Sequence, residues 1–78
     1  MRYTFPELKR IVGGRDPHRR ILCFWMHRSL DMTESEIAYT LGITQQTVHE
    51  HRDNVRRALL DADVIEQDAV DTIEASVG

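Results

Sequence analysis

Polar side chains that can form hydrogen bonds with nucleic acid are concentrated in one short segment of the chain. They are Thr44, Gln45, Gln46, Thr47, His49 and Glu50. A glutamine amide can pair with adenine through two hydrogen bonds, a glutamate can accept one from cytosine, and threonine hydroxyls can reach phosphates or bases. We therefore expect this segment to contact double-stranded DNA. The alternative is that Thr44 only caps a helix and that the two glutamines are solvated.

Arginines that can neutralise phosphates stand on either side of this segment. Arg15, Arg19 and Arg20 surround the predicted start of one helix, and Arg52 and Arg56 lie on a later helix. Cations at a helix start oppose the helix dipole, so their position there favours a role in binding over that of a solvated helix start. We expect all five to contact the DNA backbone.

The elements that position these side chains are predicted by the spacing of the apolar residues. Ile37, Ala38 and Leu41 would lie on a short helix that begins with a capping box formed by residues 33 and 36. Ala38 is small where two helices would cross, and Gly42 can adopt the positive φ that ends the first of them. Residues 33–59 therefore have the spacing of a helix-turn-helix.

The second helix of this unit is predicted to run from Gln45 to about Asp61. Val48, Val55 and Leu59 define its buried side at 100° per residue. The opposite side carries Gln46, His49, Glu50, Asp53 and Arg57. Its two acids can act as specificity elements through cytosine, or they indicate that this face does not meet DNA.

The remaining segments also predict helices, and no strand is expected. Helices are expected over about residues 6–12, 17–28 and 64–77, which makes residues 1–78 one all-α domain of four to five helices. Trp25 should be substantially buried. Asp63 with Glu66 suggests a cap for the last helix, and the spacing of Ile65, Ala69, Ile73 and Val77 predicts that these four face inward.

Charge is distributed unevenly along the chain. The net charge is −3, but residues 1–57 carry ten Lys and Arg against seven Asp and Glu, a balance of +3, while residues 58–78 carry six acids and no base. A basic body is compatible with DNA binding on one face. The acidic last helix should then sit away from the DNA.

Other classes of function find little support in the sequence. A single cysteine, Cys23, fits a reducing compartment, and the absence of a signal-peptide pattern or a long apolar run predicts a cytoplasmic protein without a membrane span. Cys23 and His27 have a metal-ligand spacing, but without a second cysteine pair Cys23 is better explained as core, and no metal or cofactor is expected. No catalytic constellation is recognisable, so we do not expect an enzyme.

Two resemblances sharpen these expectations. Residues 15–75 resemble the C-terminal DNA-binding domain of the replication initiator DnaA, although of its signature Arg-Asp-His-Thr-Thr-Val only Thr47-Val48 is present. In that family a basic loop at the place of Arg15, Arg19 and Arg20 contacts DNA. LGITQQTVHEHRDNVRRAL is similar to the recognition helix of LuxR-type regulators and of the last region of sigma factors. Both resemblances imply a Trp-repressor-like fold.

Two functions therefore remain open at the level of the sequence. The first is sequence-specific binding of double-stranded DNA, in transcription regulation or replication initiation. The second is a protein-interaction module in which the helix-turn-helix is a scaffold and the acidic C-terminal helix binds a protein partner. The oligomeric state is left open by either.

Overall fold

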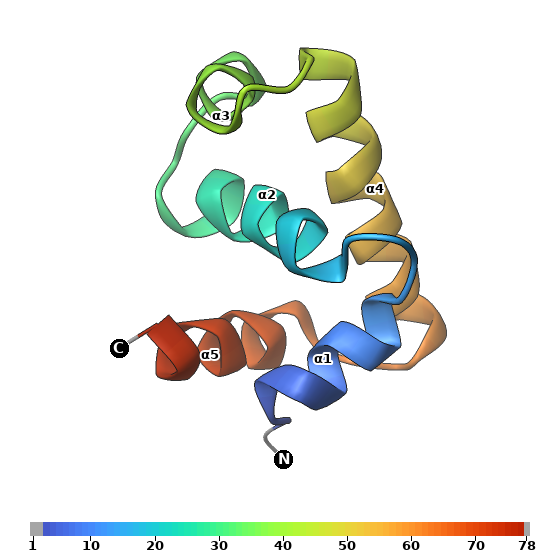
Figure 1. The fold of residues 1–78 in the computed structure, drawn as a ribbon. Helices are drawn as coiled ribbons and strands as arrows, with labels where there is room; N and C mark the ends of the chain where they lie inside the picture. Colours follow the sequence, from blue (N-terminus) through green and yellow to red (C-terminus); the bar gives the residue numbers. More distant parts are fainter. Residues whose placement is uncertain (1–2, 78) are drawn as a thin grey trace.

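The computed structural model describes residues 3–77 as five α-helices and, within that range, contains no strand (Figure 1). The helices are α1 (Phe5–Val12), α2 (Pro17–Ser29), α3 (Glu34–Leu41), α4 (Gln45–Asp61) and α5 (Glu66–Val77). The expected all-α fold class is thus confirmed. None of the described helices is both long enough and apolar enough to cross a membrane.

Four of the helices begin at side-chain caps that are local in the sequence. Thr4, Asp16, Thr33 and Thr44 each accept a hydrogen bond from the backbone N–H three residues later. This N–H would otherwise lack a partner, since the N–H groups in the first turn of a helix have no carbonyl acceptor within the helix. The caps explain why α2, α3 and α4 start where the sequence predicts, while Thr4 starts α1 one residue earlier than predicted.

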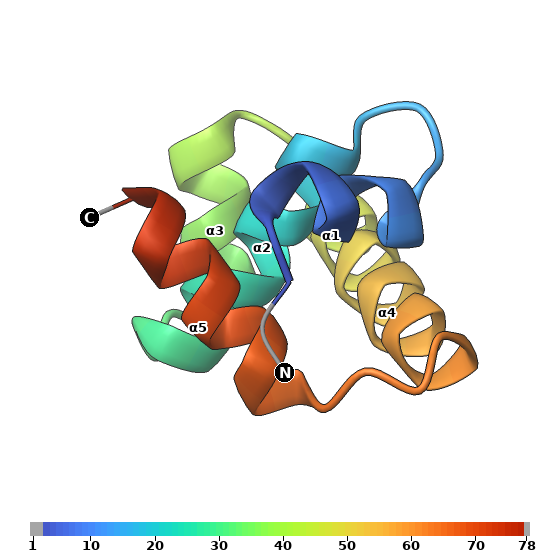
Figure 2. The ribbon, with the colours of Figure 1, turned by 90° about the horizontal axis from the view of Figure 1, so that it is seen from below.

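Helix α2 is the centre of the fold and packs against each of the other four helices. Seen from the side of the termini, α5 and α1 lie side by side in front of α2, and α4 passes along one side (Figure 2). The larger part of the core is formed by α1, α2, α4 and α5, with Ile21 of α2 fully buried. The smaller part joins α2 to α3 and α4 through Cys23, Ile37, Ala38 and Val48.

The turn between α3 and α4 has the predicted geometry. Gly42 adopts the left-handed conformation (φ 68°, ψ 34°), and Ile43 donates its N–H to the Ala38 carbonyl oxygen at 3.0 Å. A Cβ on Gly42 would meet nothing within 4 Å, so the backbone conformation and not lack of space favours glycine here. Ala38 is buried, and Val48, Val55 and Leu59 form the buried side of α4 as expected.

The start of α5 differs from the prediction. Asp63 does not cap the helix but adopts a left-handed conformation (φ 57°), and Val64 donates its N–H back to the Leu59 carbonyl oxygen at 2.8 Å. The helix begins only at Glu66, so Ile65 precedes it and its side chain is 67% exposed. The prediction that Ile65 faces inward is therefore wrong, because the turn buries Val64 in its place.

The rest of the predicted apolar stripe on α5 is confirmed. Ala69 and Ile73 are each 1% exposed, and Val70 and Thr72 are buried beside them. The Val77 side chain lies outside the described part of the structure. On α2, Phe24 is buried at 3% exposure, and Trp25 is partly buried against the same core.

Candidate nucleic-acid interface

The first turn of α4 presents two exposed glutamines, while its threonines are engaged within the protein. The Thr44 hydroxyl oxygen accepts the Thr47 N–H at 3.1 Å and lies 2.8 Å from the Thr47 hydroxyl oxygen. Gln45 and Gln46 are both exposed, and the Gln46 amide lies 3.4 Å from a carboxylate oxygen of Glu50. Both amides are therefore accessible to a partner, although that of Gln46 also donates to Glu50, whereas Thr44 acts as the helix cap.

A carboxylate that sequence reasoning did not single out, Glu34, joins α3 to α4. Its Oε2 atom lies 2.5 Å from Nη1 of Arg52 and 3.0 Å from Nδ1 of His49. Desolvation acts to raise the pKa of Glu34, but hydrogen bonds from His49 and Arg52 outweigh it and lower the pKa. Arg52, a predicted phosphate contact, is 19% exposed at its side chain and is paired with Glu34 within the protein.

The outward face of α4 carries less unbalanced negative charge than its two acids alone would give it. Arg57 forms an ion pair with Asp53 one turn earlier, and hydrogen bonding from Arg57 lowers the pKa of that carboxyl group. Glu50 is exposed beside Gln46. The Asp53 charge is thus balanced locally, and Glu50 is left as the acid that faces outward near the glutamines.

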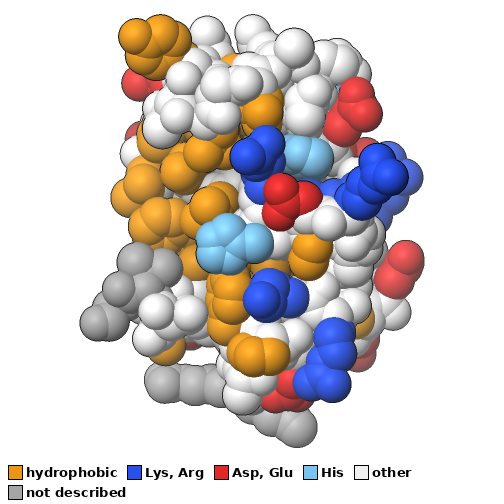
Figure 3. All heavy atoms as spheres, in the orientation of Figure 1, with side chains coloured by type: hydrophobic (Ala, Val, Ile, Leu, Met, Phe, Trp, Pro, Cys, Tyr) orange, Lys and Arg blue, Asp and Glu red, His pale blue; other side chains and the backbone are white. Residues whose placement is uncertain are grey.

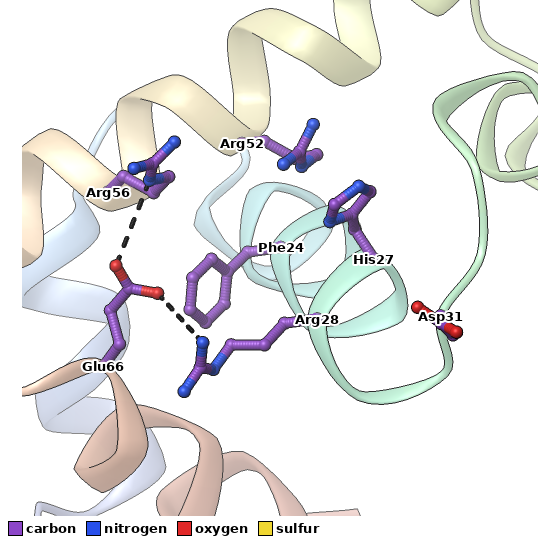
Figure 4. Close-up of a pocket in the computed structure, with 7 residues that line it drawn as sticks. All are labelled: Phe24, His27, Arg28, Asp31, Arg52, Arg56 and Glu66. Atoms are coloured by element: carbon purple, nitrogen blue, oxygen red, sulfur yellow. Dashed lines mark ion pairs between the residues drawn. The ribbon is translucent and has the colours of Figure 1, made fainter.

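A second carboxylate, Glu66 of α5, lies between two arginines from different helices. It forms ion pairs with Arg28 at the end of α2 (3.4 Å) and with Arg56 of α4 (4.0 Å). Figure 4 shows these three side chains around a hollow whose wall includes His27 and Arg52. Arg56 was predicted as a phosphate contact, but Arg28, His27 and Glu66 were not predicted as site residues.

These groups form one continuous band along a flank of α4. Three adjoining hollows share lining residues. The middle hollow shares Arg52 and Arg56 with the one beside Glu66, and it shares His49 with the one at the start of α4. The band runs from Gln45 and Gln46 at the start of α4 to the Glu66 end of the hollow. It is rich in cations, but carboxylates are interspersed along it.

The other predicted arginine group lies on the opposite flank of α4. Arg15 is exposed, Arg19 lies 3.7 Å from Asp16, and the Arg20 guanidinium lies against Gly14, where a Cβ would overlap it. Burial lowers the pKa of His51, and Arg20 and Arg19 lower it further. At 100° per residue, His51 lies on one side of the buried stripe of α4 and Arg52 on the other, so the two arginine groups are separated.

The surface distribution of charge agrees with this separation. On the face seen in Figure 3, basic side chains are spaced among histidines and acids on the half where α4 and α1 lie, and apolar side chains gather toward the side of α2 and α3. No single basic patch covers this face. A ligand that uses both arginine groups must therefore span α4.

Two of the missed groups have only weak sequence signals. Glu34 is the first residue of α3, where an acid is expected for the helix dipole alone. Arg28 is in the last turn of α2, where a cation is likewise ordinary. Their partners are far away in the chain, so only packing reveals them.

The cysteine and the possible metal ligands are accounted for by their surroundings. Cys23 is buried in the core, and burial raises the pKa of its thiol to about 11. Within the described residues, no group of three or more His, Cys, Asp or Glu side chains is arranged to hold a metal ion.

Comparison of the chain with family models, with curated proteins and with solved structures finds no match.

Proposed function

We propose that this chain binds double-stranded DNA, with α3 and α4 acting as a helix-turn-helix. The observation that carries the proposal is the exposed start of α4, where Gln45 and Gln46 project beside a cation-rich flank from a helix whose opposite side is fully buried. An α-helix fits the major groove, and its first turn also offers free backbone N–H groups to a phosphate.

In this proposal the residues divide into readers and positioning groups. Gln45 and Gln46 read base edges, with Glu50 as an acceptor for cytosine N4. Arg56 contacts phosphates on one side of α4, and Arg15, Arg19 and Arg20 do so on the other side. Since Arg52 and His49 are tied to Glu34, they hold α4 on α3 and reach DNA only by exchanging that partner.

The position of α5 supports the proposal despite the net charge of −3. The helix lies at the end of the molecule opposite the α3–α4 turn (Figure 1). Its acids Asp68, Asp71 and Glu74 are therefore remote from the start of α4, and repulsion from phosphates is weakened by salt screening over such a separation. A cytoplasmic role in transcription regulation or in replication initiation follows as the finer proposal.

Fluorescence anisotropy with labelled duplexes at several salt concentrations tests the proposal. A duplex obtained by selection from a random library should bind more tightly than random DNA, and log K should fall with log salt by about 0.9 per phosphate contacted. Arg19→Ala should weaken both duplexes alike and flatten the slope by about one unit. Gln46→Ala should narrow the gap between the two duplexes. Absence of binding at low salt would refute the function.

A second candidate, a protein-interaction module, is favoured by one specific observation. Three large apolar side chains are strongly exposed: Tyr39 at 91%, Leu60 at 78% and Ile65 at 67%. Aromatic and aliphatic residues of this kind are typical of interface cores. If the chain associates with itself or a partner through them, Tyr39→Ser should abolish that association in sedimentation velocity without changing DNA affinity.

A further inference from the structure

The ion pairs of Glu66 connect α5 to the cation-rich flank of α4. Glu66 is the first residue of α5, and its two carboxylate oxygens point to different helices: Oε1 to Arg28 of α2 and Oε2 to Arg56 of α4 (Figure 4). Arg28 also lies 3.4 Å from the side-chain oxygen of Gln67. Two guanidinium groups from separate helices thus converge on one anion.

This arrangement has the properties of a site for an oxyanion. A phosphate, like a carboxylate, presents several oxygens to converging guanidinium groups, and arginine is well suited to both. His27, Arg52 and Asp31 line the same hollow, so two further donors and one further carboxylate stand around the place that Glu66 now takes. The hollow adjoins a second one, with which it shares Arg56, and the second adjoins through His49 a third at the exposed start of α4.

The present occupant is weakly held. The side chains of Arg28 and Glu66 are each 41% exposed, and that of Arg56 is 59% exposed. Ion pairs between such exposed groups contribute little, because water and salt screen them and two long side chains must be ordered. A polyanion that brings phosphates to both arginines can therefore replace the carboxylate.

We propose that Arg28 and Arg56 form a phosphate-binding subsite for the DNA backbone, and that Glu66 occupies this subsite in the free protein as an intramolecular competitor. The inference rests on the proposed function, since it assigns a backbone contact and a built-in restraint to the same DNA-binding surface. It adds Arg28 to the interface and gives the acidic helix a role in setting affinity.

The exchange needs no movement of α5. Ala69 and Ile73 are each 1% exposed, and Val70 is buried beside them, so the helix is fixed to the body by its apolar side. Glu66 precedes these residues and stands at the edge of the hollow. Rotation of the Glu66 side chain is therefore enough to release both guanidinium groups from its carboxylate, while Arg28 can keep its contact with Gln67.

The test compares Glu66→Gln with Glu74→Gln in the anisotropy assay on a random duplex. Both variants remove one negative charge from α5, but Glu74 is exposed, two turns away, and forms no ion pair within the described residues. Glu66→Gln should bind about fivefold more tightly at low salt, the effect of one carboxylate repelling a phosphate at about 4 Å in water. Because Glu66 competes with the DNA for Arg28 and Arg56 in the parent, its removal should raise their occupancy by phosphate and steepen the salt slope by up to about 0.9 to 1.8, for one or two phosphate contacts. Glu74→Gln should change neither quantity appreciably.

A second substitution tests whether the gain in DNA affinity of Glu66→Gln depends on the arginines. Arg28→Gln placed in the Glu66→Gln background should cancel the gain and return the slope toward that of the parent. Circular dichroism verifies that each variant is folded, and Glu66→Ala, with the same expected gain, replaces Glu66→Gln if that variant is not.

The possible failures are distinct. Equal gains in DNA affinity for Glu66→Gln and Glu74→Gln would show a general charge effect and overturn the inference. No gain in affinity for Glu66→Gln would overturn it as well. In both cases the parent would still bind DNA, so the proposed function would stand. Failure of the parent and of Glu66→Gln to bind any duplex at low salt would overturn the proposed function and this inference together.

Discussion

Two isoleucines of the same predicted stripe, Ile73 and Ile65, should lose very different amounts of stability when each is truncated to alanine. Ile73 is 1% exposed in the core between α5 and the body, whereas Ile65 is 67% exposed in front of the helix. Ile73→Ala removes buried methyl and methylene groups and leaves a cavity, which costs about 2–5 kcal/mol. Ile65→Ala removes atoms that are already largely in water and should cost no more than about 0.5 kcal/mol.

The size of the first effect is large for this chain. A domain of this length has a free energy of unfolding of about 4–12 kcal/mol, so Ile73→Ala removes a substantial share of it. At about 4–8 °C per kcal/mol, the melting temperature should fall by more than about 8 °C. The milder Ile73→Val, at about 0.5–1.5 kcal/mol, remains measurable if the alanine variant is largely unfolded.

Urea titration followed by circular dichroism at 222 nm measures both variants and the parent. The midpoint should move for Ile73→Ala and stay nearly constant for Ile65→Ala, with a similar slope m in each case. Equal losses for the two, or a larger loss at Ile65, would mean that α5 starts earlier and is rotated on the body, and the packing described for this helix would be refuted.

Three further outcomes are expected. Ala38→Leu should overpack the crossing of α3 and α4 and cost about 1–3 kcal/mol; an unchanged melting temperature would contradict the crossing. Burial lowers the pKa of His51, so the stability that its neutral form supplies is present above pH ~6.5 and is lost as the pH falls through the folded pKa; His51→Gln should lack this loss in melts at stepped pH. A double-mutant cycle of Glu34→Ala with Arg52→Ala should give a coupling of about 0.5–3 kcal/mol, and zero coupling would exclude the α3–α4 tie.

The helices themselves were largely readable from the sequence. Thr33 with Glu36, Asp16 and Thr44 start helices through contacts that span three residues, so the signal and the structure it produces are adjacent in the chain. The left-handed Gly42 is equally local. The same rule failed at Asp63 because this residue adopts a left-handed conformation in the turn after α4, where Val64 bonds back to Leu59, so that α5 begins only at Glu66.

For the candidate interface, periodicity was sufficient to predict which residues of α4 are exposed, since burial of Val48 and Val55 orients Gln46 outward. It did not predict partners. The pairing of Arg52 with Glu34 spans 18 positions in the chain, and the Thr72 hydroxyl meets the Tyr3 carbonyl across 69.

The sequence by itself thus determined the all-α class, most of the helix starts and the exposed first turn of α4, because caps, glycine conformation and helical periodicity act within a few residues. Only the tertiary structure decided which cations are already occupied. That depends on how α3 packs against α4 and how α5 packs against α1 and α2. This packing brings Glu34 to Arg52 and Glu66 to Arg28 and Arg56, and ion pairs form wherever packing brings opposite charges together, whatever their separation in the chain.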